Sequence, residues 1–314
     1  MRSTPLGGPT AEESAAATRA KQPAWRRRQA LVAWLFALPF SLLFLTFMIG
    51  PLVISLILSV TDMTSRDVRD PFAVAFVGFD NVVQLFGDDK FLKAIGNTAY
   101  FVGIGVPLTV VVALLLALAL NNGIQRFRAV FRVGFYTPVV TSIVAIAVVW
   151  KYILEPDGLF NQALSAVGIS GPDWLHDTTF AMPSLIFMAM WRNMGTLMII
   201  FLAGLQGVPE EVYEAAKVDG ASSFRRFIDL TLPLMRPTIL LGSVLISVYY
   251  FQFFEEAFVM TGGGPLNSTL SVTYYTYNQF GFGNYGLASA ASYVLAIAIG
   301  LISLLQFRLL RSKD

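Results

Sequence analysis

The sequence predicts an all-α membrane protein with six transmembrane helices. Of its 314 residues, 55% are hydrophobic and only 13% are charged, and the mean hydropathy is +0.64. Soluble domains carry about 25% charged residues, so this chain is expected to fold in lipid. Six long apolar runs and an uneven distribution of Lys and Arg along the chain support the same fold class.

The amino-terminal residues 1–28 are expected to form a disordered cytoplasmic tail. The first 24 are rich in Ala, Ser, Thr, Gly and Pro, and such a segment buries too little apolar surface to offset the entropy of ordering. Arg26, Arg27 and Arg28 follow. The apolar run after them is too long for a signal peptide, so it is expected to remain as the first span of a membrane domain covering 29–314.

Six apolar stretches are long enough to cross a membrane. A helix needs roughly 20 residues to cross about 30 Å of hydrocarbon, because every backbone polar group must be satisfied within it. The predicted spans are about 31–60, 97–120, 133–153, 181–205, 238–260 and 285–307. The first contains Pro39 and the pair Gly50-Pro51, which predict a tilt or kinks.

The distribution of basic residues predicts the orientation. Sixteen of the 22 Lys and Arg residues lie in the amino-terminal tail, the 121–132 loop, the 206–237 loop and the carboxyl-terminal tail. Five lie in the intervening segments 61–96, 151–180 and 261–284. Basic residues accumulate on the cytoplasmic side. Both termini are therefore expected to face the cytoplasm.

Several functional classes lack the residues they require. The chain has no cysteine and one histidine, His176, so no metal site is expected. It contains no phosphate-binding loop, serine nucleophile elbow or zinc-protease motif. A net charge of +2 gives no reason to expect a nucleic-acid partner. Catalysis and ATP binding are therefore expected to belong to other chains.

The 206–237 segment predicts two short helices joined by a glycine turn. Pro209 suits a first helical position, and Glu210 and Glu211 favour the positive end of the helix dipole. A helix from Pro209 to Asp219 would end at Gly220, which readily adopts a left-handed conformation. A second helix would be capped by Ser222 or Ser223 and would run to about Leu232, where Pro233 would close it.

This segment resembles the EAA loop of ABC importer permeases. The resemblance rests on the spacing of Glu214-Ala215-Ala216, Gly220, Leu230 and Leu232-Pro233; Leu230 stands where the family usually has isoleucine. In that family the loop, here including Asp219, is a cytoplasmic coupling helix that seats in a cleft of the ATP-binding subunit. The other interpretation is a solvated amphipathic connector.

Two further stretches resemble the carbohydrate-uptake permeases. One is Phe76-Val77-Gly78-Phe79-Asp80-Asn81 with the later Asn97-Thr98, and the other is Thr261-Gly262-Gly263-Gly264-Pro265. The second is similar to the subunit type of the larger maltose and glycerol-phosphate permeases. The resemblance implies a bacterial or archaeal cytoplasmic membrane. It also implies a second homologous permease, two ATP-binding subunits that bind ATP, and an extracytoplasmic solute-binding protein.

Candidate solute-pathway residues lie in the fourth and fifth spans. Arg192 is deep in the fourth span, where a charge is costly unless it faces a wet cavity or a partner group. Asn193 and Thr196 add hydrogen-bonding groups beside it, and Gly195 permits close backbone approach. Together they predict a polar patch facing the pathway. Snorkelling, or an ion pair with the partner permease, is the alternative.

In the fifth span, Ile246, Tyr250 and Phe253 share one helical face. Tyr250 and Phe253 have rings on which a sugar could stack, and Ser247 or Gln252 could bond its hydroxyls. Ordinary helix packing would produce the same aromatic stripe, so both interpretations stay open.

An ion-coupled secondary transporter is the alternative function. Such transporters usually need carboxylates within the membrane. Spans one, two, three and six contain none, and Glu255 and Glu256 near the end of span five are the best candidates. Transport that requires ATP would distinguish the two functions.

Overall fold

The computed structural model describes residues 24–70, 74–122 and 127–310. These residues form helices, turns and loops, and no strand occurs among them; one isolated bridge pairs Thr61 with Phe76. The chain divides after Ser55 into two compact units. We describe each unit by itself.

The first unit consists of α2 (Ala24–Phe44), a π-helical turn (Leu45–Ile49) and the start of α3 (Gly50–Ser59). The π-turn comes directly before Gly50-Pro51, where the sequence predicts a kink, because the wider turn accommodates a proline without a backbone donor. The helix begins at Ala24, within the segment 1–28 expected to be a tail, and residues 1–23 lie outside the described residues. Its apolar side chains are exposed, as in Phe36 at 83%.

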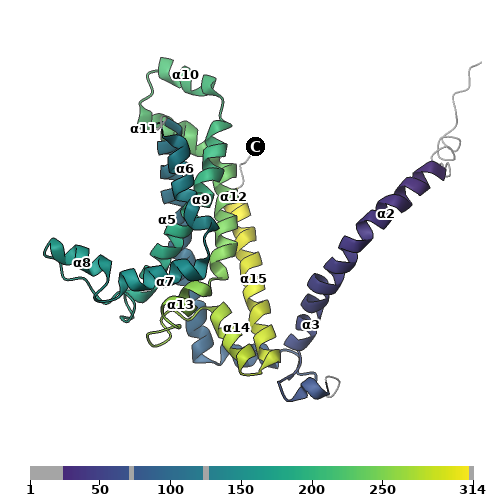
Figure 1. Cartoon of the computed structure of the whole chain (residues 1–314). Coiled ribbons are helices and arrows are strands. Elements are labelled where there is room, and N and C mark those ends of the chain that lie inside the picture. Colours follow the sequence, from purple (N-terminus) through teal and green to yellow (C-terminus); the bar gives the residue numbers. More distant parts are fainter. Residues whose placement is uncertain (1–23, 71–73, 123–126, 311–314) are drawn as a thin grey trace, which may run out of the picture. The chain divides into compact units, whose positions relative to one another are not determined.

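The second unit is a helical bundle with short connecting helices (Figure 1). Its long helices are α5 (Asp89–Asn122), α9 (Ala181–Gln206), α12 (Leu232–Phe251) and α15 (Tyr285–Leu310). The shorter helices lie between them in the chain: α4 (Asp80–Phe86), α6 (Arg128–Val140), α7 (Ile143–Leu154), α8 (Leu159–Ala166), α10 (Glu210–Val218), α11 (Ser223–Arg226), α13 (Glu255–Met260) and α14 (Val272–Gly281).

The core of the bundle lies where α5, α9 and α12 pack together. Phe101 of α5 and Phe201 of α9 are fully buried, and Ala113 and Ala117 let the helix backbones approach closely. In lipid, helices associate through such close packing and through hydrogen bonds, because burial from hydrocarbon gives little driving force. The core therefore depends on shape complementarity between small and aromatic side chains.

Membrane-length helices agree with most of the predicted spans. Five helices are long and apolar enough to cross a membrane: Leu31–Ser59, Asp89–Asn121, Ala181–Gln206, Ser223–Phe251 and Tyr285–Leu309. The number becomes six if Arg128–Val140 and Ile143–Ala166, which meet at an angle of 99°, form one broken span. These counts refer to the described residues.

Two predicted spans differ from the helices observed. The third, 133–153, falls on α6 and α7, because Thr141 turns to an extended conformation and its hydroxyl bonds the Thr137 carbonyl. The fifth, 238–260, ends at Phe251 and is followed by the short helix α13. Side-chain bonds of this kind compete with the helical backbone pattern, and runs of apolar residues do not reveal them.

The two ends of the bundle carry different structures. Helices α10 and α11 lie at one end, together with the carboxyl-terminal end of α15, and α14 lies at the other (Figure 1). At the α14 end, the amide of Asn97 donates to the carbonyls of Asn267 and Leu270 at 2.7 and 2.9 Å. Thr98 accepts from the Val272 backbone at 3.1 Å. The Asn97-Thr98 motif thus contacts the segment that follows the Thr261–Pro265 motif.

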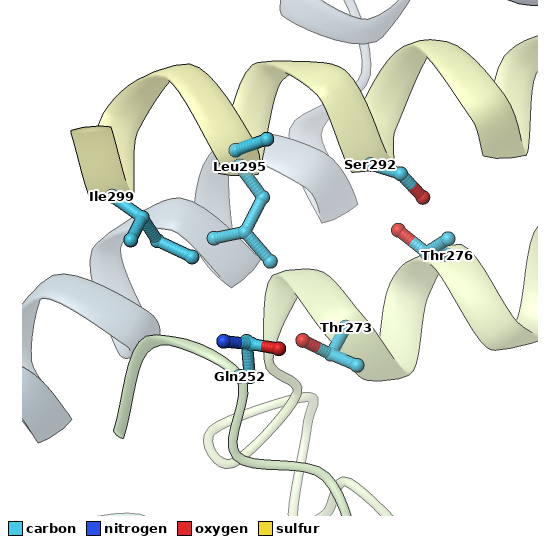
Figure 2. Close-up of a pocket in the computed structure, with 7 residues that line it drawn as sticks. Gln252, Thr273, Thr276, Ser292, Leu295 and Ile299 are labelled. Carbon is cyan, nitrogen blue, oxygen red and sulfur yellow. The ribbon is translucent and has the colours of Figure 1, made fainter. Parts of the chain in front are cut away.

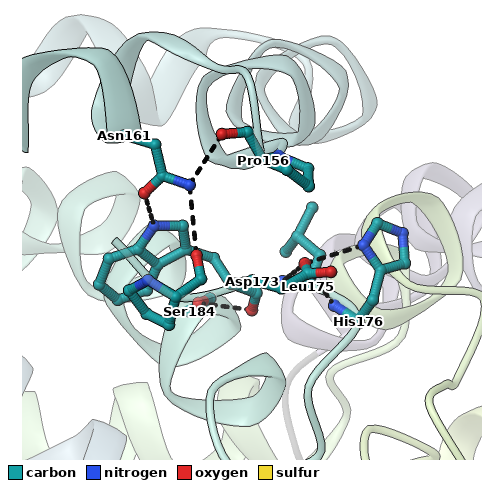
Figure 3. A network of polar contacts seen from close by, with 8 residues as sticks. Pro156, Asn161, Asp173, Leu175, His176 and Ser184 are labelled. Atoms are coloured by element: carbon teal, nitrogen blue, oxygen red, sulfur yellow. Dashed lines mark hydrogen bonds and ion pairs between the residues drawn. The ribbon is translucent and has the colours of Figure 1, made fainter. Parts of the chain in front are cut away.

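A network of polar contacts fixes the segment between α8 and α9 (Figure 3). Asn161 accepts from the Trp174 indole at 2.8 Å, and its own amide donates to the Pro156 and Pro172 carbonyls. His176 lies in this loop and pairs with Asp173 at 2.9 Å. Burial alone would raise the pKa of Asp173, but hydrogen bonds from His176 and Leu175 outweigh it and hold the pKa below its usual value.

Candidate functional site

The segment between α9 and α12 folds as the sequence predicts at its first helix and turn. Helix α10 follows Pro209, begins with Glu210 and Glu211, and has Lys217 in its last turn, an order that suits the helix dipole. Ser222 caps α11 by accepting from the Arg225 backbone at 3.3 Å. The acidic start and the cap explain why two short helices form here.

The turn between these helices depends on Gly220. Its φ is +77°, in the left-handed region that glycine adopts without steric cost. The Ala221 backbone donates to the Ala216 carbonyl at 2.9 Å, and the Gly220 backbone donates to the Lys217 carbonyl at 3.1 Å. These two bonds form a Schellman motif. They fix the angle between α10 and α11.

The surface of this helical pair carries both small and bulky apolar residues. Glu214, Ala215 and Asp219 are exposed. Val218 and Phe224, on either side of the turn, are 88% and 75% exposed. Two bulky apolar side chains are therefore exposed around one turn. Neither residue was predicted from the sequence, although their positions beside Gly220 could have indicated them.

The second part of the segment differs from the prediction. Pro233 does not close the helix: α11 continues through a π-helical turn at Phe227–Thr231 into α12, with Pro233 in its first turn. Proline has no backbone N–H group to donate, and the wider turn before Pro233 lets the helix continue without that hydrogen bond. Leu230 and Leu232 are half-buried, and the Tyr213 hydroxyl lies 3.1 Å from the Thr231 hydroxyl. These contacts join the pair of short helices to the bundle.

Arg192 on α9 contacts Tyr249 on α12. Its Nη1 donates to the Tyr249 hydroxyl at 2.9 Å, and its guanidinium carbon lies 5.9 Å from the centroid of that ring. Its Nε atom is buried and has no hydrogen-bond partner within the described chain. Thr196 is half-buried one turn away, whereas Asn193 is buried and donates to the Ala189 carbonyl.

Contacts with other helices surround the side chains of Tyr250, Phe253 and Ser247. Tyr250 is fully buried, with its hydroxyl 2.8 Å from that of Thr109. Phe253 stacks on Phe101 with ring centroids 4.0 Å apart. Ser247 donates to the Ser243 carbonyl and accepts from Gln306, both at 2.7 Å. The structure therefore brings Tyr250 and Phe253 together at Phe101.

The buried position of Phe253 leads to a stability prediction. Truncation of a buried phenylalanine typically costs about 3–5 kcal/mol in soluble cores. Phe253→Ala is therefore expected to lower the temperature at which the purified protein aggregates. Tyr249→Phe, which removes only the hydroxyl bonded to Arg192, should leave that temperature unchanged. An equal aggregation temperature for Phe253→Ala and wild type would show that the ring is not packed as described.

A cavity of about 400 Å³ lies between the end of α12, α14 and α15. Figure 2 shows the Gln252 amide and the hydroxyls of Thr273 and Thr276 on one side, and Ser292, Leu295 and Ile299 of α15 on the other. The Gln252 amide donates to the Val248 carbonyl at 2.9 Å, which leaves its carbonyl oxygen for another donor. This mixture of polar and apolar groups suits a sugar, which has both hydroxyls and an apolar face.

Glu256 is the most deeply buried charged residue in the described part of the chain, at 1% exposure. It lies on α13, which packs on α7 and α9. Neither of its carboxylate oxygens has a hydrogen-bond partner among the described residues. No group of three or more His, Asp or Glu residues in those ranges has the geometry of a metal site.

Comparison with known proteins identifies a consistent set of relatives. The model of the family described as "Binding-protein-dependent transport system inner membrane component" matches residues 29–312. The lactose transport system permease protein LacF of Rhizobium radiobacter is 37% identical, over 89% of this chain and 94% of its own length. The trehalose/maltose transport system permease protein MalF of Thermococcus litoralis is 31% identical, over 88% and 94%.

A third relative and a solved structure extend the comparison. The arabinooligosaccharides transport system permease protein AraP of Bacillus subtilis is 32% identical, over 92% of this chain and 93% of its own. A chain of a bacterial alginate ABC transporter, solved with a pentasaccharide-bound periplasmic protein, has a TM-score of 0.76 and 24% identity. It covers 92% of this chain and 97% of its own length. That likeness supports the helical membrane fold described above.

Proposed function

Because the chain belongs to the family of binding-protein-dependent transport system inner membrane components, we propose that it is a permease subunit of an ATP-driven importer for a sugar or sugar-like solute. It is a membrane component and not an enzyme. The relatives named for lactose, trehalose or maltose, and arabino-oligosaccharides support a sugar as the solute. The chain would form half of the pathway, beside a second homologous permease.

The α10–α11 pair would couple this pathway to ATP hydrolysis. The observation that carries the proposal is the exposed glycine turn with Val218 and Phe224 beside it. These side chains would insert into a cleft of one of two ATP-binding subunits, while Glu214, Ala215 and Asp219 contact its rim. Leu230, Leu232 and Pro233 would transmit its movement to α12. ATP would bind only to those partner chains.

The orientation follows from this role. The end that carries α10 and α11 would face the cytoplasm, together with both termini. The α14 end would face the extracytoplasmic solute-binding protein that delivers the sugar. Nucleotide-driven closure of the ATP-binding subunits would then move the bundle between outward-open and inward-open states. In the middle of the bundle, Arg192, Tyr249, Thr196 and Gln252 would contact the passing sugar.

Cysteine cross-linking tests the coupling role directly. The chain has no native cysteine, so Val218→Cys introduces one thiol at the tip of the turn. We expect a maleimide-benzophenone reagent attached to this thiol to photo-cross-link it to the ATP-binding subunit in native membranes, and ATP to change the yield. The same substitution at Val167, exposed on the α8 segment, is the control. Cross-linking of Val167→Cys but not of Val218→Cys would rule out the coupling role.

Arg192 provides a prediction for the pathway. Arg192→Gln removes the charge and the donor to Tyr249, so uptake should fall by about tenfold, which corresponds to a loss of about 1.4 kcal/mol in solute contacts. ATP hydrolysis by the assembled complex should continue. Arg192→Lys keeps the charge and should be intermediate, because lysine lacks the planar donor set. Normal uptake with Arg192→Gln would remove this residue from the pathway.

A further inference from the structure

We infer that a second sugar-binding site lies at the α14 end of the bundle, in a pocket formed by α5, the start of α9 and the loop before α14. This inference rests on the proposed function and adds a specific site to it. The pocket has a volume of about 320 Å³, within the usual range for small-ligand sites and suited to one sugar ring. Its polar lining consists of Lys93, Asn97, Tyr100, Thr178, Thr179 and Ser268.

The polar groups of this pocket retain free hydrogen-bonding capacity. Lys93 uses one of its three donors, on the Leu266 carbonyl at 2.7 Å. Asn97 uses both amide hydrogens on backbone carbonyls of the same loop, which leaves its carbonyl oxygen as an acceptor. The Ser268 hydroxyl oxygen is buried and has no partner within the described residues. Because buried polar groups are usually satisfied, the unpartnered Ser268 hydroxyl indicates a polar ligand.

The rest of the lining favours a sugar over a cationic ligand. Tyr100 is 48% exposed, and the negative face of its ring attracts the C–H groups on the apolar face of a pyranose. Thr178 and Thr179 are exposed and contribute two hydroxyls from the opposite wall. The lining contains one cation and no carboxylate. A ligand rich in oxygen acceptors and without a positive charge fits this composition.

The framework of the pocket is fixed by long-range contacts. Asn97 and Lys93 hold the Leu266–Leu270 loop against α5. On the other wall, the Thr179 backbone donates to Asp177 at 2.7 Å, just before α9 begins. The wall positions are therefore set before a ligand arrives, which reduces the entropic cost of binding. At the end opposite the coupling helices, such a site would receive one ring of the sugar before it enters the bundle.

Ligand protection of a single cysteine tests the inference. Thr179→Cys would be made in the complete transporter in nanodiscs and labelled with a membrane-impermeant maleimide. Lactose, maltose and trehalose are the probes, and glycine betaine at equal osmolarity is the control. Labelling should slow by the factor 1 + [sugar]/Kd, about threefold at twice the dissociation constant. Labelling at Val167→Cys, exposed outside the pocket, should stay constant.

Hydroxyl-removing variants test whether the protection comes from this pocket. Adding Thr178→Val and Ser268→Ala to the Thr179→Cys protein should abolish protection of its thiol. Ser165→Ala should not, because that hydroxyl lies outside the pocket and already donates to the Gln162 carbonyl. No protection by any of the three sugars, equal slowing at position 167, or protection that survives the Thr178→Val and Ser268→Ala changes would each overturn the inference.

Uptake by the same preparations separates this inference from the proposed function. If the pocket site exists, the Thr178→Val and Ser268→Ala changes together should raise the sugar concentration needed for half-maximal uptake. ATP-dependent uptake with unchanged half-saturation and no protection would overturn the second site and leave the importer function intact. If the wild type shows no ATP-dependent sugar uptake, the proposed function fails whatever the labelling shows.

Discussion

Replacing Gly220 with valine is expected to reduce sugar uptake by at least about tenfold. A left-handed conformation costs an L-residue about 1–2 kcal/mol, more when the side chain is β-branched, and about 1.4 kcal/mol corresponds to a factor of ten. Beyond the adjacent residues, no heavy atom lies within 4 Å of where a Cβ on Gly220 would be. The effect therefore arises from the backbone conformation of the turn and not from a steric clash.

The matched control for this variant is Gly220→Asn. Asparagine adopts the left-handed conformation more readily than other non-glycine residues, so uptake should remain close to that of the wild type. The measurements are uptake into proteoliposomes and the amount of ATP-binding subunit that co-purifies. If Gly220→Val transports sugar and retains its partner as well as Gly220→Asn does, the turn does not position a coupling surface.

Gly195→Ala is expected to prevent normal packing of α6 against α9. A Cβ on Gly195 would overlap the backbone carbonyl oxygen of Phe135 and would also lie 2.9 Å from its carbonyl carbon. Backbone atoms cannot rotate away as a side chain can, so the helices must separate. Overpacking of this kind typically costs about 1–3 kcal/mol. The folded yield and the aggregation temperature of the purified protein should both fall.

Gly134→Ala is the control for this effect. Gly134 precedes Phe135 on α6, and no heavy atom outside its own stretch of helix lies within 4 Å of where its Cβ would be. The same added methyl group should therefore leave the yield and the aggregation temperature unchanged. Equal behaviour of Gly195→Ala and Gly134→Ala in gel filtration would contradict the close approach of α6 to α9.

Local rules in the sequence predicted the features that depend on neighbouring residues. The turn at Gly220 and the cap at Ser222 follow from conformational preference and hydrogen bonding over a few positions, and both occur in the structure. Close backbone approach at Gly195 was also expected, and Phe135 provides it. Apolar runs located the membrane-length helices because the length of a span is set by the membrane.

Other features depend on contacts between distant residues. The aromatic pattern of Tyr250 and Phe253 would be the same whether the rings bind a sugar or pack in a core. Phe101, far earlier in the chain, packs against both rings and decides the question. Pro233 indicated a helix end, but the π-helical turn before it allows α11 to continue into α12. The pocket at Asn97 could not be predicted either, because it forms only when the Leu266–Leu270 loop folds onto α5.

The energy source for transport is the central claim, and a single uptake experiment tests it. The purified complex would be reconstituted in proteoliposomes with ATP inside and the solute-binding protein outside, and labelled sugar uptake would be followed with and without an ionophore. We predict uptake that requires ATP and is unaffected by the ionophore. Uptake that proceeds without ATP and stops when the ionophore collapses the ion gradient would contradict the account. The buried carboxylate of Glu256 would then be the candidate for coupling transport to an ion.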